Sequence, residues 1–269
     1  MPGKTELKPN HRPLELVFVR HGESEGNVAS KAAEDGDPSL FTEEFRKRHS
    51  SSWNLTPKGE EQAKAAGEWI RKNINGGIFD AYYTSTYRRA KRTAGLLNLP
   101  NAKWYIRDYV REHDWGNLDV MPDEERYTKY PEIMQQRSIN PYYFAAPGGE
   151  SLADVLIRAR VGILATLYRK IPNKRAIVVS HGNMIWPIRI IMEGLLPEDY
   201  LEMKNRKDPK DKINNCQVFQ YTRIDPITGE VSEKFDWMRS VCPWNLNPEL
   251  DAWRPLNHRK FSNEELANA

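Results

Sequence analysis

The sequence predicts an α/β fold of three layers, α/β/α, with a mostly parallel central sheet. Residues 16–19 and 176–180 are short apolar runs rich in β-branched side chains, as expected of strands that are covered on both faces. Each run leads into a histidine–glycine pair, at His21 and at His181. Amphipathic helical patterns such as residues 57–74 lie between the strands, which is typical of parallel β-α-β units.

The composition fits one large domain. The chain has 269 residues, of which 39% are hydrophobic, so it can bury a substantial core. We expect a single domain over residues 1–269, with a core at 14–220, an insertion at 28–54 and a C-terminal hairpin and tail at 216–269. The 40 basic and 37 acidic residues leave a net charge of only +3, which argues against a dedicated nucleic-acid-binding protein.

The leader and the cysteines predict the compartment. Residues 1–13 are polar and punctuated by prolines, without the apolar stretch of a secretion signal. No later run approaches about 18 apolar residues, so we expect neither a membrane-spanning helix nor a membrane partner. Cys216 and Cys242 lack metal-ligand spacing, and two thiols in such a chain suggest a reducing compartment, with one disulfide left open. We therefore expect a cytoplasmic protein.

The first strand leads into a helix and then into a long insertion. Residues 22–27 should begin a helix whose free amides face any phosphate held by Arg20 and His21. Residues 28–54 are expected to be irregular and polar, apart from a short helix at 43–48. Three aromatic side chains would anchor this segment: Phe41, Phe45 and Trp53. A surface insertion is favoured here over a lid on the site.

The next helix has clear boundaries in the sequence. Thr56 is a suitable N-cap, Pro57 fits the first helical position, and Gly76-Gly77 ends the pattern. The apolar positions recur at helical spacing: Ala63, Ala66, Trp69, Ile70 and Ile74. A strand at 78–84 and a basic helix at 87–94 are expected to follow.

Weaker patterns fill the middle of the chain. Residues 104–106 predict a weak strand, and residues 111–117 form a polar loop with two carboxylates and an imidazole. A partly helical stretch at 123–134 and a loop at 142–149 should follow. Residues 150–167 then predict a long amphipathic helix.

The last third combines a helix, a hairpin and a tail. The helix is expected at 185–196, where Pro187 would fall in the first turn and be tolerated. Strands at 217–221 and 233–237 flank the turn residues 225–229 and should pair as a hairpin. The tail after the hairpin is expected to wrap the domain as an irregular strap.

The two histidine–glycine pairs define a candidate site. Ligands of open α/β sheets bind outside the carboxyl ends of the strands, which is where both pairs fall. If their strands are neighbours, the imidazoles of His21 and His181 meet at one edge of the sheet. Arg20 offers a fork of donors suited to phosphate, and a histidine can act as nucleophile or base near neutral pH.

Several separated motifs strengthen this interpretation. They are Arg20-His21-Gly22-Glu23-Ser24 with Asn27, Leu55-Thr56 with Gly59 and Gln62-Ala63, Ser85 with Arg89-Ala90 and Thr93, Glu112 with Gly116, Gly148-Gly149-Glu150-Ser151, and Ser180-His181-Gly182-Asn183. In this order they resemble the signature of the histidine phosphatase superfamily, branch 1. The resemblance covers residues 14–220 and implies the phosphoglycerate mutase-like fold of that family.

The resemblance also implies a phosphohistidine mechanism. His21 would attack phosphorus, and Glu112 would protonate the leaving alkoxide and then help to activate water. The phosphoryl oxygens would be bound by a further set: Arg20, Asn27, Arg89, His181 and Gly182. This chemistry needs no cofactor and no metal, and the sequence shows no carboxylate cluster that would suggest a metal site.

Two of these assignments have competing neighbours. Arg89 is favoured over Arg88 and Arg92 because an alanine and a threonine follow it at the positions of the family motif. Glu112 is favoured over Asp114 because a glycine follows it at the family spacing.

The family contains phosphatases, mutases and non-catalytic members. We favour a phosphatase of a small phosphomonoester, because residues 127–137 lack the arginine pair with which mutases hold a substrate carboxylate, and because the insertion at 28–54 is long. Phosphoglycerate mutase-type phosphoryl transfer is the alternative enzyme. A module that only binds phosphorylated proteins is less favoured, since non-catalytic members usually lose one of the catalytic residues and all are present here.

Overall fold

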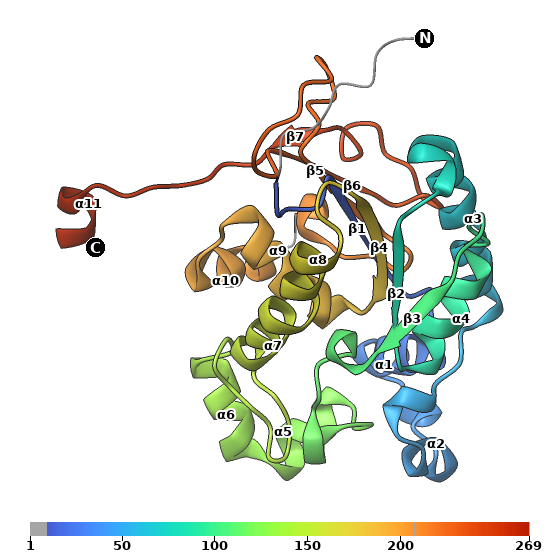
Figure 1. Cartoon of the computed structure of the whole chain (residues 1–269). Coiled ribbons are helices and arrows are strands. Elements are labelled where there is room, and N and C mark those ends of the chain that lie inside the picture. Colours follow the sequence, from blue (N-terminus) through green and yellow to red (C-terminus); the bar gives the residue numbers. More distant parts are fainter. Residues whose placement is uncertain (1–9, 207, 269) are drawn as a thin grey trace.

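The computed structural model describes residues 10–206 and 208–268, which form a seven-stranded sheet with helices on both faces (Figure 1). The strand order is β3-β2-β4-β1-β5-β6-β7. The strands are β1 Glu15–Arg20, β2 Ala81–Ser85, β3 Trp104–Arg107, β4 Arg175–Ser180, β5 Val218–Thr222, β6 Trp237–Val241 and β7 Arg254–Pro255. The first four in the order are parallel, and the other three pair antiparallel. The predicted three-layer fold with a mostly parallel sheet is confirmed.

The side chains of β1 pack into two separate cores, one on each face of the sheet, because successive side chains of a strand point to opposite faces. Val17 and Val19 pack into a cluster with α3 (Pro57–Asn73) and α4 (Arg88–Leu96). Leu16 and Phe18 pack into the cluster on the opposite face. That face is covered by α7 (Leu152–Arg158), a π-helical segment (Ala159–Leu164), α8 (Ala165–Lys170) and α9 (Gly182–Glu193).

The remaining helices lie in the connections and the tail. They are α1 Glu25–Glu34, α2 Glu43–Lys47, α5 Asp123–Lys129, α6 Pro131–Ile139, α10 Pro197–Arg206 and α11 Asn263–Ala267. Short 3₁₀ turns occur at Pro38–Leu40, Ser50–Ser52, Asn75–Gly77, Asp108–Val110, Gly116–Leu118 and Pro209–Asp211. Among the described residues, none of the helices combines the length and the apolar character needed to cross a membrane.

Several predicted boundaries are confirmed. Thr56 caps α3 by accepting the N–H of Gly59 at 3.0 Å, and the helix ends before Gly76 and Gly77, which both have positive φ. The short helix expected at 43–48 is α2. The strand expected from residue 78 starts three residues later, at the beginning of β2.

The prediction that residues 28–54 are irregular is wrong for a large part of the segment. Helix α1 begins after a reciprocal capping box of Ser24 and Asn27, and it extends to Glu34. Ala29 of α1 then packs against Phe41 and Phe45, so the segment has a small apolar cluster of its own.

The prediction that Pro187 falls in a first helical turn is also wrong. Helix α9 begins at Gly182, directly after His181, so Pro187 is its sixth residue and cannot donate a hydrogen bond to the Asn183 carbonyl. The helix continues through this position because Met184, Ile185 and their neighbours are buried against the sheet.

The C-terminal predictions are correct in kind and wrong in position. The second hairpin strand is β6 and not 233–237, because the Ile224–Val231 bridge closes only the turn and the chain rejoins β5 at Trp237. The tail returns to the sheet in β7 but then leaves the body and ends in α11, which buries no residue (Figure 1). It is therefore a strap only in its first part. Of the predicted leader, residues 1–9 lie outside the described part of the chain.

Close backbone packing at Gly59 yields a first prediction. A Cβ on Gly59 would lie 2.0 Å from the Glu23 carbonyl oxygen, so Gly59→Ala must push away the loop that follows His21. We expect a loss of about 1–3 kcal/mol in the free energy of unfolding, measured by urea denaturation. Gly95→Ala in α4 is the matched control, since its Cβ would meet nothing within 4 Å. An equal loss in both variants would contradict the packing argument.

Candidate active site

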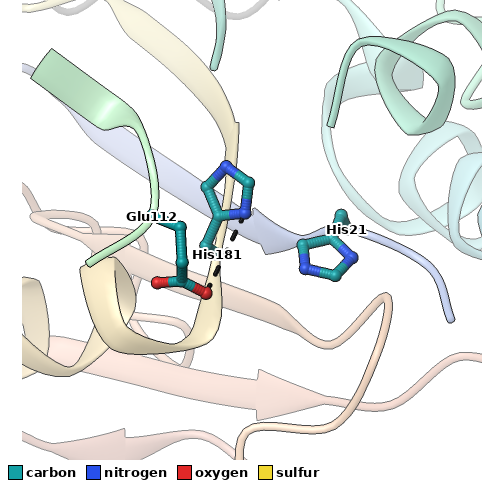
Figure 2. A group of neighbouring side chains, drawn as sticks. All are labelled: His21, Glu112 and His181. Atoms are coloured by element: carbon teal, nitrogen blue, oxygen red, sulfur yellow. Dashed lines mark ion pairs between the residues drawn. The ribbon is translucent and has the colours of Figure 1, made fainter. Parts of the chain in front are cut away.

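The parallel pairing of β1 and β4 brings the two histidines together. Arg20 is aligned with Ser180 in the register, and the His21 N–H donates to the Ser180 carbonyl at 2.9 Å. The two imidazole centroids lie 5.1 Å apart, and both rings are buried. Glu112, from the loop after β3, faces His181 beside His21 (Figure 2). The expectation of neighbouring strands is confirmed.

The contacts of His21 fix which nitrogen can act as a nucleophile. Nδ1 lies 2.7 Å from the Gly22 carbonyl oxygen, which only accepts, so Nδ1 carries the proton. Nε2 accepts the Nε–H of Arg89 at 3.0 Å and therefore presents its lone pair. Burial, with Arg89 and Arg20 nearby, holds the pKa of His21 well below its usual value. The ring is thus neutral at neutral pH, as an attacking imidazole must be.

His181 has one satisfied nitrogen and one free nitrogen. Nε2 lies 2.8 Å from the Ser85 hydroxyl, at the end of β2. Among the described residues Nδ1 has no hydrogen-bond partner, and it lies 4.0 Å from Glu112 Oε2. Burial, with Arg89 and the His21 ring nearby, lowers the pKa of His181 well below its usual value. The free nitrogen therefore lies near the Glu112 carboxyl group, and the His21 ring lies beside its imidazole.

Two buried arginines supply fixed positive charge. Arg89 donates through Nη1 to the Ser50 carbonyl at 2.7 Å, and its guanidinium lies 4.9 Å from the Tyr87 ring centroid. Arg20 donates through Nη1 to the Ile213 carbonyl at 2.6 Å, whereas its buried Nε has no partner in the described part of the chain. Burial lowers the pKa of both guanidinium groups, which nevertheless stay charged in proteins. A buried, unpaired N–H next to two imidazoles favours an anionic ligand.

The geometry separates the competing assignments. Arg88 reaches Asn54 and Arg92 pairs with Glu60, so of the three arginines only Arg89 bonds to His21. Asp114 turns back to accept the backbone N–H of the following Gly116 at 2.8 Å, whereas Glu112 lines the cavity. The structure thus brings Arg89 and Glu112 to the histidines, in agreement with the sequence preference.

The two remaining predicted site residues lie at helix starts. Asn27 Oδ1 accepts hydrogen bonds from the Ser24 backbone and hydroxyl and from Asn215 Nδ2, which leaves the Asn27 amide N–H₂ for a ligand. Gly182 is the first residue of α9, where free backbone amides favour an anion. Gly182 lines a second cavity with Arg20, of about 560 Å³, that meets the main one at Asn27 and Glu112.

The main cavity has a volume of about 660 Å³ and shows what the sequence missed. The segment at 28–54 forms one wall, through Ser50 and Trp53 among others, and the preference for a surface insertion over a lid stays a prediction. Residues of the 111–117 loop, which we call the acid loop, and Lys204 of α10 form other walls. Asn215, which donates to the His21 carbonyl at 3.0 Å, was not identified either. No local pattern could have revealed these contacts, because they join segments far apart in the sequence.

The two histidines and Glu112 are also residue types that bind metal ions. One possible ligand atom from each of His21, Glu112 and His181 lies within 4.8 Å of the others. However, the His21 Nε2 lone pair already accepts a hydrogen bond from Arg89, and two buried guanidinium groups adjoin the trio. Fixed cations oppose a further cation and attract an anion at low dielectric. The donor set therefore fits a phosphoryl group better than a metal ion.

Comparison with known proteins agrees with this arrangement. The sequence model of the histidine phosphatase superfamily (branch 1) matches residues 16–216. The chain belongs to this superfamily. The matched range includes all of the predicted site residues at the carboxyl ends of β1 and β4 and around them, from Arg20 to Gly182.

Named proteins resemble the chain over most of its length. A 2,3-bisphosphoglycerate-dependent phosphoglycerate mutase of Bradyrhizobium diazoefficiens is 31% identical over 70% of this chain and 84% of its own. Among solved structures, a putative alpha-ribazole-5'-P phosphatase of Escherichia coli has a TM-score of 0.61 at 16% identity, covering 82% of this chain and 95% of its own. A mycobacterial glucosyl-3-phosphoglycerate phosphatase has a TM-score of 0.60 at 22% identity, covering 77% and 92%.

The buried histidines of this superfamily member predict a pH effect on stability. An unfolded histidine binds a proton below about pH 6.5, whereas folded His181 does not until a lower pH. The unfolded state then holds more protons, so stability falls as the pH drops below about 6.5. We expect the loss of Tm between pH 7.5 and 5.5 to be smaller in His181→Gln than in the wild type. Exposed His11→Gln is the control, and equal slopes in all three proteins would contradict the argument.

Proposed function

We propose that this chain is a phosphomonoesterase that hydrolyses a small phosphorylated metabolite through a phosphohistidine on His21. The observation that carries the proposal is a neutral, buried His21 whose unprotonated Nε2 accepts a hydrogen bond from Arg89, with Arg20 as a second buried cation nearby. Such an arrangement offers a nucleophile and a binding site for the phosphoryl oxygens in the same place. We further propose that it acts in the cytoplasm on a small-molecule substrate, without a metal, and that neither nucleic acid nor a membrane takes part.

The first step would transfer the phosphoryl group to the enzyme. His21 Nε2 forms a bond to phosphorus while the bond from phosphorus to the leaving oxygen breaks. As this bond forms, Arg89 gives up its hydrogen bond to Nε2 and donates instead to a phosphoryl oxygen, and the unpaired Nε–H of Arg20 gains an acceptor. His181 Nδ1 faces the same position. These donors match charge that spreads over the phosphoryl oxygens in the transition state.

The second step would release inorganic phosphate. Glu112 gives its proton to the leaving oxygen, and as a carboxylate it then takes a proton from water that attacks the phosphohistidine. The Glu112 side chain is 18% exposed and lines the cavity, so water can reach it. Its Oε1 accepts the His113 backbone N–H at 2.9 Å, which holds the carboxyl group in place. Attack by water breaks the bond from phosphorus to nitrogen and restores neutral His21.

Phosphoglycerate mutase-type transfer is the second candidate, and one structural observation favours it. Arg126, just before the span that lacks an arginine pair, lies 4.5 Å from the Trp115 ring centroid, and Arg137 lies 4.8 Å from it. Arg126 and Arg137 are thus close together in the structure, although they are not adjacent in the sequence. In addition, the curated relatives are named mutases. Hydrolysis remains the proposal because Arg126 is already engaged by the Leu118 carbonyl and by Asp123. A module that only binds phosphoproteins would have no use for Glu112 beside His181.

A pulse-labelling experiment tests the proposal. Phosphomonoesters labelled on phosphorus (nucleotides, sugar phosphates and phosphoglycerates) are mixed briefly with the protein and quenched. We expect acid-labile, base-stable label on the wild type and release of labelled inorganic phosphate. His21→Ala should carry no label and lose turnover by several orders of magnitude, because a covalent route has no second nucleophile. Label that returns to an isomeric phosphoglycerate would instead identify a mutase, and equal label on His21→Ala would exclude the proposed nucleophile.

The role of Glu112 predicts a dependence on the leaving group. A basic alkoxide needs a proton in the transition state, an assistance typically worth about 10²–10⁴-fold, whereas nitrophenolate needs it much less. Glu112→Gln should therefore slow alkyl phosphates severely and nitrophenyl phosphate only modestly, in steady-state kcat measurements. Asp114→Asn is the matched control, since Asp114 bonds to its own loop. If Asp114→Asn alone shows the selective defect, the acid is misassigned.

A further inference from the structure

We propose that Trp244, in the C-terminal segment beyond the family match, is a positioning residue for the phosphate site and acts through Asn215. Trp244 Nε1–H donates to the Asn215 backbone carbonyl at 2.6 Å. The side chain of the same asparagine donates through Nδ2 to the His21 carbonyl at 3.0 Å and to Asn27 Oδ1 at 3.1 Å. The indole N–H of Trp244 thus holds Asn215, whose side-chain amide donates hydrogen bonds to two residues of the site, His21 and Asn27.

Asn215 belongs to a tight turn that closes the end of β1. We call residues 214–217 the 214–217 turn; in it the Gln217 N–H donates to the Asn214 carbonyl at 3.1 Å, and Cys216 has φ of +53°. The Cys216 N–H donates to the Arg20 carbonyl at 3.1 Å, and the Arg20 N–H donates to the Gln217 carbonyl at 3.1 Å. The backbone on which the nucleophile sits is therefore held by this turn.

The C-terminal part of the chain supports the turn from two sides. Gln217 Nε2 donates to Ser240 Oγ of β6, while its Oε1 accepts the Asn214 N–H at 2.6 Å. Trp244 lies three residues after β6 and reaches the Asn215 carbonyl from there. A conformation with positive φ at a non-glycine residue is held by its surroundings, so removing one support should loosen the whole turn.

The functional consequence concerns phosphate binding. Asn215 is one of the donors that engage Asn27 Oδ1, which leaves the Asn27 N–H₂ group for a ligand. Loss of the indole hydrogen bond should let Asn215 move and so weaken the hold on Asn27 and on the His21 backbone. The expected effect is weaker binding of the phosphoryl group, by the factor of about 3–10 that one neutral hydrogen bond supplies.

The experiment is a double-mutant cycle on the full-length chain, read by calorimetric affinity for inorganic phosphate. Trp244→Phe keeps an aromatic side chain and removes the indole N–H, and should weaken binding about 3-fold to 10-fold with Tm nearly unchanged. Asn215→Ala should weaken it at least as much. If Trp244 acts through Asn215, the double variant should match Asn215→Ala alone. Independent effects that multiply would overturn the proposal, because a general loss of structure does not depend on Asn215.

Trp253→Phe is the matched control. Trp253 is another tryptophan of the tail, packed on Arg239 at 4.5 Å, and removing its N–H should leave phosphate affinity unchanged. The inference rests on the proposed function only in that the site binds phosphate. If the wild type binds no phosphate, the proposed function fails. The link from Trp244 to Asn215 is then tested by amide hydrogen exchange in the 214–217 turn. Faster exchange there in Trp244→Phe but not in Trp253→Phe supports the link from Trp244 to Asn215, and unchanged exchange refutes it.

Discussion

The site depends above all on the register between β1 and β4. Because Arg20 and Ser180 are aligned, the chain leaves both strands at the same height, and each next residue is a histidine. A shift by one residue would turn one imidazole to the other face of the sheet. The register is in turn fixed by burial, since both strands supply apolar side chains to the cores on both faces. The packing of the sheet and the positions of the two histidines thus depend on the same strand register.

The electrostatics of the site follow from the same burial. Removing Arg20 and Arg89 from water leaves two cations that the described protein groups only partly satisfy, through the Ile213 and Ser50 carbonyls and His21. The same surroundings keep both histidines neutral. In the proposed reaction an incoming phosphate dianion would meet fixed positive charge and a neutral imidazole, and the one exchange needed is release of the hydrogen bond from Arg89 to His21. Each property would be lost in a solvated site, where a histidine titrates near its ordinary value.

The sequence predicted those features that are coded locally. The strand–histidine–glycine patterns gave β1, β4 and the residues at their ends, and Thr56 and the glycines at 76 and 77 gave the limits of α3. It failed where tertiary contacts override local preference, as at Pro187, which buried packing retains inside α9, and at β6, whose start is set by pairing with β5. The cavity wall formed by residues 28–54 and the contact of Asn215 with His21 could not be predicted, because both join distant segments.

The shared residues alone do not decide between hydrolysis and transfer, because both proposed reactions would pass through the same phosphohistidine. What differs is the acceptor that stands opposite the bond from nitrogen to phosphorus in the second step, water or a hydroxyl group of the substrate. In the proposed mechanism that choice would depend on the walls of the cavity, which here come from residues 28–54, from the loop around Trp115 and from Lys204. These walls lie outside the two histidine–glycine motifs, so members of one superfamily can keep the same chemistry and differ in its outcome.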